Sequence, residues 1–363
     1  MTALVDRNDP LGWWPRSQRE GIRVFGAGGF ARRVASAARA LGIQVHAFLT
    51  SAEPLLGELD GVAVCRADAA AIAACPTWIG VFNREADSDY AAVRAQLEAL
   101  AAGASLVWPQ AYYARLRDNL GWCFWLHPPQ EYDALAADLA ATRQRLDNEQ
   151  SRQTWDRLLA FRRMLTPDWQ SPSPDTAVQY MPDWLRAEIR APLRIVDGGA
   201  YRGETLRDLA RLVPVEQAWT FEPDLQNYGA LVQTMADWPT PITHLPAGLS
   251  DRCGSSRFAT GHGESSALSS SGECTVPIVA LDHCLHLARP NFVKLDVEGH
   301  EYAALCGART TLLRERPIPA IVGYHRWDDL WRIPRYIDSL GPDDRIRIGL
   351  HGHNSFETVF YAY

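Results

Sequence analysis

A short apolar strand that runs into a glycine-rich turn constrains the fold of this chain more than any other feature. The segment is Arg194-Ile-Val-Asp-Gly-Gly-Ala-Tyr-Arg-Gly-Glu-Thr205, and the next predicted strand ends in the acidic residue Glu222. Glycines in such a turn let the backbone approach a ligand, and a carboxylate that ends the second strand can bind the two hydroxyls of a ribose. The pair therefore predicts a nucleoside-binding half of an open α/β sheet.

The composition narrows the class of protein. A chain of 363 residues with 47% apolar and 22% charged residues is typical of a soluble globular protein with two domains. A net charge of -7 without a basic run argues against nucleic acid as a partner. The seven cysteines are scattered without a C-x-x-C pair, which favours reduced thiols. A polar N-terminus and the lack of a membrane-length apolar run predict a cytoplasmic protein.

Two α/β patterns with a helical connector between them predict the domain organisation. We expect a smaller Rossmann-like α/β domain over 1–127, a helical connector over 128–185 and a second α/β domain over 186–363. In the first domain, a strand over 21–25 leads into a glycine turn and a helix over 30–41. The strands predicted for the second domain are 193–197, 217–222, 242–246, 291–296, 318–323, 344–350 and 355–362.

A second block of acidic residues follows the predicted strand 291–296. The strand ends at Asp296, and Glu298, His300 and Glu301 follow in the loop and the first helical turn. Because ligands bind beyond the carboxyl ends of strands in an open α/β sheet, Asp296 is expected to lie beside the glycine turn. Carboxylates also stabilise helix N-termini, so Glu301 is interpreted as a cap or an ion-pair partner.

Several ordered motifs between residues 150 and 363 resemble the FkbM-type SAM-dependent methyltransferases, where SAM is S-adenosylmethionine. The resemblance implies a class I methyltransferase fold, SAM as cofactor and methylation of a hydroxyl, often on a sugar or a natural product. The matching segments are Val196-Asp-Gly-Gly-Ala-Tyr-Arg-Gly203, Phe221-Glu-Pro223, Pro246-Ala-Gly-Leu-Ser-Asp251, Val279-Ala-Leu-Asp282, Lys294-Leu-Asp-Val-Glu-Gly-His-Glu301, Tyr324-His-Arg-Trp-Asp-Asp-Leu330 and Glu357-Thr-Val-Phe-Tyr361.

The same resemblance implies a set of cofactor-binding residues. The glycine turn would hold the methionine end of SAM, Glu222 the ribose, and Ala247 with Gly248 the adenine, while Tyr180 would close over the cofactor. The full set of cofactor-binding candidates is Tyr180, Asp197, Gly198, Gly199, Ala200, Tyr201, Gly203, Glu222, Pro223, Ala247 and Gly248.

Methyl transfer to an alcohol benefits from a base near the hydroxyl. His325 is the first candidate, because a neutral imidazole is available near pH 7, and Asp296 is the second, as base or as orienting group. Glu298 and His300 are candidates for contact with the acceptor. Alternatively, Asp296, Glu298 and His300 hold a divalent cation. The spacing does not require a metal, and we expect none.

Two further segments leave alternatives open. His351-Gly-His353 is either a pair of metal ligands or a pair of loop residues, and as two isolated histidines without a carboxylate nearby they are interpreted as loop residues. The serine-rich stretch 261–272 is either a plain flexible loop or a lid over the substrate.

The N-terminal segment resembles the nucleotide-binding domain of bacterial sugar O-acyltransferases. The matching pieces are Val24-Phe-Gly-Ala-Gly-Gly-Phe-Ala31, Leu59-Asp-Gly-Val-Ala-Val64 and Trp78-Ile-Gly-Val-Phe-Asn83. The acidic residue that a dinucleotide site needs is missing near Leu49 and Thr50, so we expect no functional NAD site. The domain then either packs or forms a homo-oligomer, or it holds a nucleotide sugar or a glycan.

Three functions follow from these patterns. The first is a SAM-dependent O-methyltransferase that acts on a sugar-containing acceptor: a glycan, a nucleotide sugar or a glycosylated natural product. The second is an NAD-dependent sugar-nucleotide oxidoreductase that uses the turn 26–31. The third is a non-catalytic partner in glycan assembly. The expected partner is a small-molecule or glycan acceptor, without nucleic acid and without a membrane span.

Overall fold

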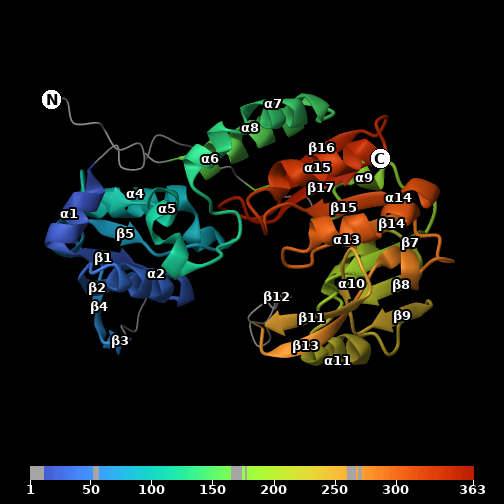
Figure 1. Cartoon of the computed structure of the whole chain (residues 1–363), viewed down its shortest axis with the longest axis horizontal. Coiled ribbons are helices and arrows are strands. Elements are labelled where there is room, and N and C mark those ends of the chain that lie inside the picture. The colour runs from blue at the N-terminus through green and yellow to red at the C-terminus, as the bar shows by residue number, and fades with distance from the viewer. Residues whose placement is uncertain (1–11, 52–56, 165–173, 176–177, 260–266, 269–271) are drawn as a thin grey trace. The chain divides into compact units, whose positions relative to one another are not determined.

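A computed structural model describes residues 12–51, 57–164, 174–175, 178–259, 267–268 and 272–363 (Figure 1). The chain forms two compact units. Unit 1 comprises 1–137, 155–174 and 352–356, and unit 2 comprises 138–154, 175–351 and 357–363. Each unit is thus assembled from separate stretches of the chain. The predicted domain boundaries, 1–127, 128–185 and 186–363, remain a prediction. Within the described residues, every helix is too short or too polar to span a bilayer.

Unit 1 is built on a six-stranded sheet with the order β3-β4-β2-β1-β5-β6. All neighbouring strands are parallel except β3, which pairs with β4 in antiparallel orientation. The strands are β1 (Ile22–Phe25), β2 (Val45–Thr50), β3 (Glu58–Leu59), β4 (Val62–Arg66), β5 (Thr77–Ile79) and β6 (Leu106–Val107). The helices are α1 (Trp13–Glu20), α2 (Gly29–Ala40), α3 (Ala69–Ala73), η1 (Ala86–Ser88), α4 (Tyr90–Leu100), α5 (Pro109–Leu120) and α6 (Pro129–Asp133).

Residues 352–356 complete the core of unit 1 although they come almost last in the chain. The ring of Phe356 lies 4.9 Å from that of Phe82, centroid to centroid. Asn354 is fully buried, and its side-chain oxygen accepts a hydrogen bond from the backbone N–H of Tyr90. Buried aromatic residues of unit 1, such as Phe82 and Phe356, therefore pack against one another in its core, as large aromatic side chains commonly do.

Unit 2 contains a seven-stranded sheet with the order β16-β17-β15-β14-β7-β8-β9 (Figure 1). The strands run parallel except β17, which is antiparallel to both β15 and β16. The strands are β7 (Leu193–Gly198), β8 (Val215–Phe221), β9 (Ile242–Leu245), β14 (Phe292–Leu295), β15 (Ile318–Val322), β16 (Ile346–Leu350) and β17 (Thr358–Ala362). Every residue of β14 is buried, as expected for a parallel strand covered on both faces.

Further elements complete unit 2. A four-stranded sheet has the order β10-β13-β11-β12 and consists of β10 (Gly248–Leu249), β11 (Gly254–Ala259), β12 (Ala267–Leu268) and β13 (Cys274–Val279). The helices are α9 (Asp183–Arg186), α10 (Glu204–Leu212), α11 (Leu225–Thr234), α12 (Leu281–Cys284), α13 (Glu301–Gly307), α14 (Arg309–Glu315) and α15 (Asp329–Leu340). Helices α7 (Ala136–Arg145) and α8 (Glu149–Arg163) form the segment in which the chain passes between the units.

The strand order of unit 2 sets the place of a ligand site. From β7 the chain continues to β8 and β9 on one side, and later returns as β14 and β15 on the other side. In open α/β sheets, ligands bind outside the carboxyl ends of the strands at the point where the order reverses. That point lies between β7 and β14, where the glycine turn and Asp296 follow their strands.

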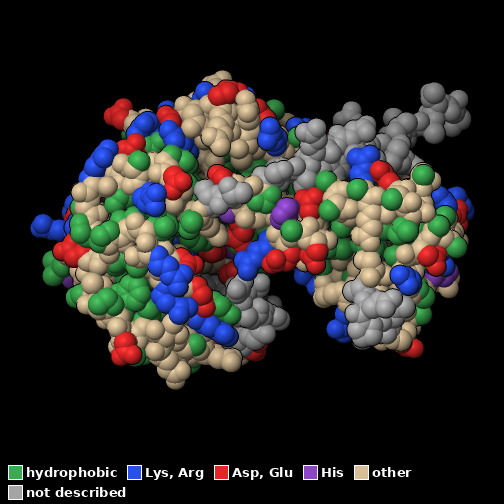
Figure 2. Space-filling model, turned by 180° about the vertical axis from the view of Figure 1, so that it is seen from behind, with side chains coloured by type: hydrophobic (Ala, Val, Ile, Leu, Met, Phe, Trp, Pro, Cys, Tyr) green, Lys and Arg blue, Asp and Glu red, His purple; other side chains and the backbone are tan. Residues whose placement is uncertain are grey.

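The predicted α/β class, with a Rossmann-like parallel sheet in each part of the chain, is confirmed. Helices α1, α3 and α5 and the strands β11, β12 and β13 were not among the predicted elements. Figure 2 shows Lys and Arg side chains interspersed with Asp and Glu side chains on the visible face, in keeping with the modest net charge of -7.

Candidate active site

The glycine turn after β7 owes its glycines to tight packing inside unit 2. Gly199 has a φ of 72°, and a Cβ atom there would overlap the backbone carbonyl of Asp296. Gly203 has a φ of 88°, and a Cβ atom there would overlap the side chain of Met235. At Gly199 the backbone of Asp296 excludes a side chain, quite apart from any ligand. At Gly203 the end of the Met235 side chain can move, and the positive φ is what favours glycine.

Lys294 of β14 binds the backbone of this turn through its ammonium group. Its ammonium group donates hydrogen bonds to the carbonyl oxygens of Gly198 and Gly199, at 3.0 and 2.6 Å. It also lies 3.0 Å from the carboxylate of Asp197, its cross-strand neighbour. Burial disfavours the charge on Lys294, but Asp197 and other carboxylates outweigh it and raise the pKa of Lys294. Lys294 was not among the predicted site residues. A lysine within the otherwise apolar strand Phe-Val-Lys-Leu is unusual, because buried charges need a partner, and this pattern could have indicated that Lys294 has one.

Glu222 connects the glycine turn to the end of β8. One carboxylate oxygen accepts a hydrogen bond from the N–H of Tyr201, and the other accepts one from the N–H of Asp224, each at 2.9 Å. Burial raises the pKa of Glu222 to about 7, against the lowering effect of these two donors. Each oxygen keeps a further acceptor site, because a carboxylate oxygen has two lone pairs. The position suits a ligand with two neighbouring hydroxyls.

The adjoining loops supply the remaining cofactor candidates. Pro223 directly follows Glu222, and Ala247 and Gly248 follow β9, which is the strand next to β8. Ala247 is buried, with 5% of its surface exposed. These residues therefore lie at the same carboxyl edge of the sheet as Glu222, and their contact with a cofactor stays a prediction.

Tyr180, in the segment before α9, contacts the acidic block that follows β14. Its hydroxyl donates a hydrogen bond of 2.7 Å to Oδ2 of Asp296 and accepts one from the side chain of Gln179. Gln179 in turn donates to the carboxylate of Glu357. Tyr180 has a φ of 70°, a strained conformation for a bulky residue that the surrounding contacts must hold in place. Gln179 and Glu357 are orienting residues that were not among the predicted site residues.

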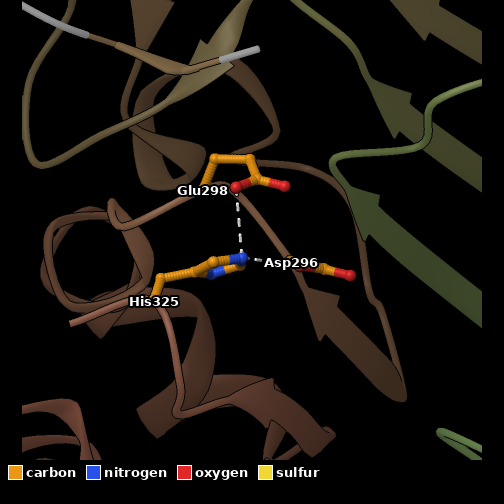
Figure 3. Close-up of side chains that lie close together, drawn as sticks. All are labelled: Asp296, Glu298 and His325. Carbon is orange, nitrogen blue, oxygen red and sulfur yellow. Dashed lines mark ion pairs between the residues drawn. The ribbon is translucent and has the colours of Figure 1, made fainter. Parts of the chain in front are cut away.

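Three side chains from β14, its following turn and the end of β15 converge beyond the sheet (Figure 3). Nε2 of His325 lies 3.3 Å from Oε2 of Glu298 and 3.6 Å from Oδ1 of Asp296. The ligand-type atoms of Asp296, Glu298 and His325 all lie within 4.8 Å of one another. We call these three residues the Asp296 cluster.

Glu301 fixes the opposite side of the His325 ring. Its Oε1 lies 2.8 Å from Nδ1 of His325, and both side chains are fully buried. The same carboxylate accepts hydrogen bonds from the N–H groups of Val297 and Gly299, so it cannot turn away. The predicted ion-pair function of Glu301 agrees with these contacts, and its partner is His325.

The acidic surroundings of His325 favour its imidazolium form, in contrast to the neutral ring expected near pH 7. Burial disfavours the imidazolium, but the carboxylates of Glu298 and Glu301 outweigh it and raise the pKa of His325 well above its ordinary value. The ring is also fully buried, whereas 24% of the Asp296 side chain is exposed. Of the two candidates for the base, Asp296 is the one that an acceptor can reach.

His300 takes a different position from the one that its sequence neighbours suggest. The chain turns through left-handed conformations at Glu298 and Gly299, with φ values of 52° and 91°, and His300 then caps α13. Among the described residues, the Asp296 cluster contains His325 and not His300. Burial lowers the pKa of His300, and its Nδ1 is buried without a hydrogen bond among the described residues.

The other singled-out segments lie outside this site. His353 lies 3.0 Å from the carboxylate of Asp89, which corrects the expectation of no carboxylate nearby, and His351 contacts the hydroxyl of Tyr361 at 2.9 Å. Most of the serine-rich stretch 261–272 falls outside the described residues. In unit 1, β2 ends at Thr50, and the described residues 44–51 contain no carboxylate beside the glycine turn.

Comparison with known proteins finds a family match in this region. Residues 197–341 match the family model described as the methyltransferase FkbM domain. The matched range begins at Asp197 and includes Glu222, the Asp296 cluster and Glu301. The FkbM match therefore contains most of the candidate site and supports methyltransferase activity.

A solved structure extends the FkbM likeness to both units. The crystal structure of methyltransferase FkbM from Methylobacillus flagellatus KT matches with a TM-score of 0.76 and 20% identity, over 99% of this chain and 94% of that chain. The predicted class I methyltransferase fold is thus confirmed. The crystal structure of precorrin-6y C5,15-methyltransferase from Geobacter metallireducens GS-15 matches 52% of this chain and 91% of that chain, with a TM-score of 0.32 and 10% identity, which is too low to bear on the fold.

No curated protein matches the chain. The resemblance of the N-terminal segment to sugar O-acyltransferases is not confirmed by these comparisons and stays a prediction.

Proposed function

We propose that this protein is a SAM-dependent O-methyltransferase that methylates a hydroxyl of a sugar-containing acceptor. The observation that carries the proposal is the convergence of Glu222, the glycine turn and Asp296 at one edge of the unit 2 sheet. This edge is the binding edge of an open α/β sheet, and it lies within the range that matches the FkbM domain.

The residues at the end of β8 fit the nucleoside part of SAM. Glu222 is buried, its two oxygens are fixed by the N–H groups of Tyr201 and Asp224, and both oxygens retain acceptor capacity. Two ribose hydroxyls would donate to them. Ala247 and Gly248 would lie beside the adenine, and the turn Gly198–Gly203 beside the methionine part.

The acceptor hydroxyl is proposed to bind at Asp296. When bound, SAM supplies a methyl group on a positively charged sulfur, ready for in-line displacement. Asp296 accepts the hydrogen bond of the acceptor hydroxyl and takes up its proton as the oxygen–carbon bond forms and the carbon–sulfur bond breaks. Placement of the hydroxyl supplies most of the rate, and proton removal adds a smaller factor.

The neighbouring groups orient Asp296 for this task. Tyr180 donates to Oδ2 of Asp296 and leaves Oδ1 facing the cluster. Glu298, with 17% of its side chain exposed, offers a second acceptor for a neighbouring hydroxyl. Two carboxylates close together suit an acceptor with several adjacent hydroxyls, which supports a sugar as substrate.

Binding and transfer measurements with the full chain test the proposal. Calorimetry should show binding of SAM and none of NAD, and labelled methyl should pass from SAM to at least one member of a panel of nucleotide sugars, glycolipids and oligosaccharides. Binding of NAD in place of SAM would favour the oxidoreductase alternative. SAM binding without transfer to any sugar, but with transfer to a sugar-free alcohol, would reject the acceptor class.

A further inference from the structure

We propose that the Asp296 cluster binds one divalent cation of the Mg²⁺ and Mn²⁺ class (Figure 3). The sequence does not require a metal, and nothing in the family match assigns one. Two carboxylates and one imidazole form a set of hard and borderline ligands that suits these cations. The existence of the site stands on the geometry alone, and its purpose rests on the proposed methyl transfer.

The distances within the cluster are close to those of ligands around one cation. Mg²⁺ holds its ligands at about 2.1 Å in an octahedron, so adjacent ligand atoms lie about 3.0 Å apart and opposite ones about 4.2 Å apart. The observed separations from Nε2 of His325 are 3.3 and 3.6 Å, and all three atoms lie within 4.8 Å of one another. Shifts of a few tenths of an ångström in these side chains would therefore bring the three ligand atoms to the separations expected around one cation.

The ligand atom of His325 is selected by its partner on the other side of the ring. Glu301 lies 2.8 Å from Nδ1 and holds the proton on that nitrogen. A cation that displaces the proton of Nε2 would then meet a lone pair directed at Asp296 and Glu298. A carboxylate behind a histidine in this way is the usual outer support of a metal-binding imidazole. Because Glu301 is itself held by the N–H groups of Val297 and Gly299, the whole arrangement is preorganised.

Asp296 and Glu298 each direct one carboxylate oxygen into the cluster. Tyr180 binds Oδ2 of Asp296, while Oδ1 faces His325. Oε2 of Glu298 is buried, makes no hydrogen bond among the described residues and points at Nε2 of His325 (Figure 3). Glu298 adopts a φ of 52°, a costly conformation for this residue that aims its side chain at the cluster.

The local charge balance favours a cation. Asp296, Glu298 and Glu301 surround a single imidazole, and burying carboxylates without compensation is expensive. Lys294 does not supply the charge, because its ammonium group contacts Asp197 and the carbonyls of the glycine turn. A divalent cation on Oδ1 of Asp296 would have free coordination positions for acceptor hydroxyls. It would promote loss of the hydroxyl proton to Oδ2 of Asp296, which keeps one lone pair beside the bond from Tyr180.

Mn²⁺ binding to the full chain tests the site without SAM or acceptor. The chain is treated with a chelator, and free Mn²⁺ is followed by its electron paramagnetic resonance signal during titration. We expect one Mn²⁺ per chain, displaced by Mg²⁺. Glu298→Gln and Asp296→Asn should each weaken binding at least tenfold, since even outer-shell changes cost about 10- to 100-fold.

Two control variants separate this proposal from the proposed function. Glu216→Gln changes an exposed carboxylate that pairs with Arg194, and Glu222→Gln changes the SAM site; both should retain Mn²⁺ binding. Circular dichroism shows whether each variant is folded. Absence of Mn²⁺ binding by the wild-type chain overturns the cation site whatever the variants do, as does unchanged affinity in folded Glu298→Gln or Asp296→Asn. Failure of SAM binding with Mn²⁺ binding intact would count against the proposed function alone.

Discussion

The ammonium nitrogen of Lys294 lies 3.0 Å from Oδ1 of Asp197, and both side chains are fully buried where β14 pairs with β7. The same ammonium group binds the first two carbonyl oxygens of the glycine turn. One lysine therefore links the strand that ends in Asp296 to the turn proposed to hold SAM. The geometry of both halves of the site depends on this single charged group.

Replacement of Lys294 by Met should destabilise unit 2. The change leaves Asp197 as a buried carboxylate without its cation and removes the donor for two turn carbonyls. Breaking a buried ion pair in this way costs about 3–5 kcal/mol. Urea unfolding measures the loss, and Glu216→Gln at the exposed start of β8 should change stability by less than about 0.5 kcal/mol. The double variant Asp197→Asn with Lys294→Met should recover part of the loss, and a single variant as stable as wild type would refute this account of the pair.

Gly199→Ala and Gly229→Ala should have opposite effects. Gly199 has a positive φ and its Cβ would overlap the carbonyl of Asp296, so the variant should lose more than about 4 kcal/mol or fail to fold. Gly229 lies within α11 with open space around it, so alanine there should stabilise by roughly 0.5–1 kcal/mol. Thermal unfolding of the two variants decides the point. A Gly199→Ala protein as stable as wild type would mean that the turn is not packed as described.

Glu222→Gln should weaken SAM binding by at least about tenfold, the loss expected when a charged hydrogen bond to a ligand is removed. The amide places an N–H₂ group against the backbone N–H of either Tyr201 or Asp224, where only an acceptor fits. Calorimetry with SAM measures the effect, and Glu216→Gln on the same strand serves as the matched control. Equal affinity of the Glu222→Gln variant and wild type would remove the ribose assignment.

SAM affinity should fall as the pH is lowered from 8 to 6. Burial raises the pKa of Glu222 to about 7; the N–H groups of Asp224 and Tyr201 and the charge of Lys294 lower it, and the charge of Asp224 raises it. Ribose hydroxyls donate to the ionised carboxylate, so protonation of the free protein below pH 7 competes with binding. The dissociation constant should therefore rise by up to about tenfold at pH 6.

The Glu222→Gln variant provides the comparison for this pH dependence. Its affinity for SAM should be nearly constant between pH 6 and 8, because the titrating group is gone. A wild-type dissociation constant that stays constant over the same range would show that Glu222 remains ionised or does not contact the cofactor.

The sequence predicts the sheet and its binding edge because both depend on local patterns. Apolar runs fix the strands to within a few residues, and the carboxyl ends of parallel strands must meet at one edge, which brings Glu222 and Asp296 to the same side. Roles that depend on distant packing are harder to predict. The glycine at 199 is explained by close contact with the backbone of Asp296, which no spacing in the sequence reveals.

The histidines show the same limit. His300 is only two residues from Glu298, so sequence proximity favours it as the partner of that carboxylate. Left-handed conformations at Glu298 and Gly299 turn the chain, and His325, from the end of the next strand, takes the position instead. The carboxylates of Glu298 and Glu301 also raise the pKa of His325 against the effect of burial, which the type of residue alone does not reveal.

Residues 352–356 belong to unit 1, although they lie between β16 and β17 near the end of the chain. Domains usually fold in order as the chain leaves the ribosome, the N-terminal one first. Here the N-terminal unit lacks Asn354 and Phe356 until residues 175–351 of unit 2 have been synthesised. Its core therefore closes late, and a nascent chain interrupted before residue 352 leaves both units incomplete.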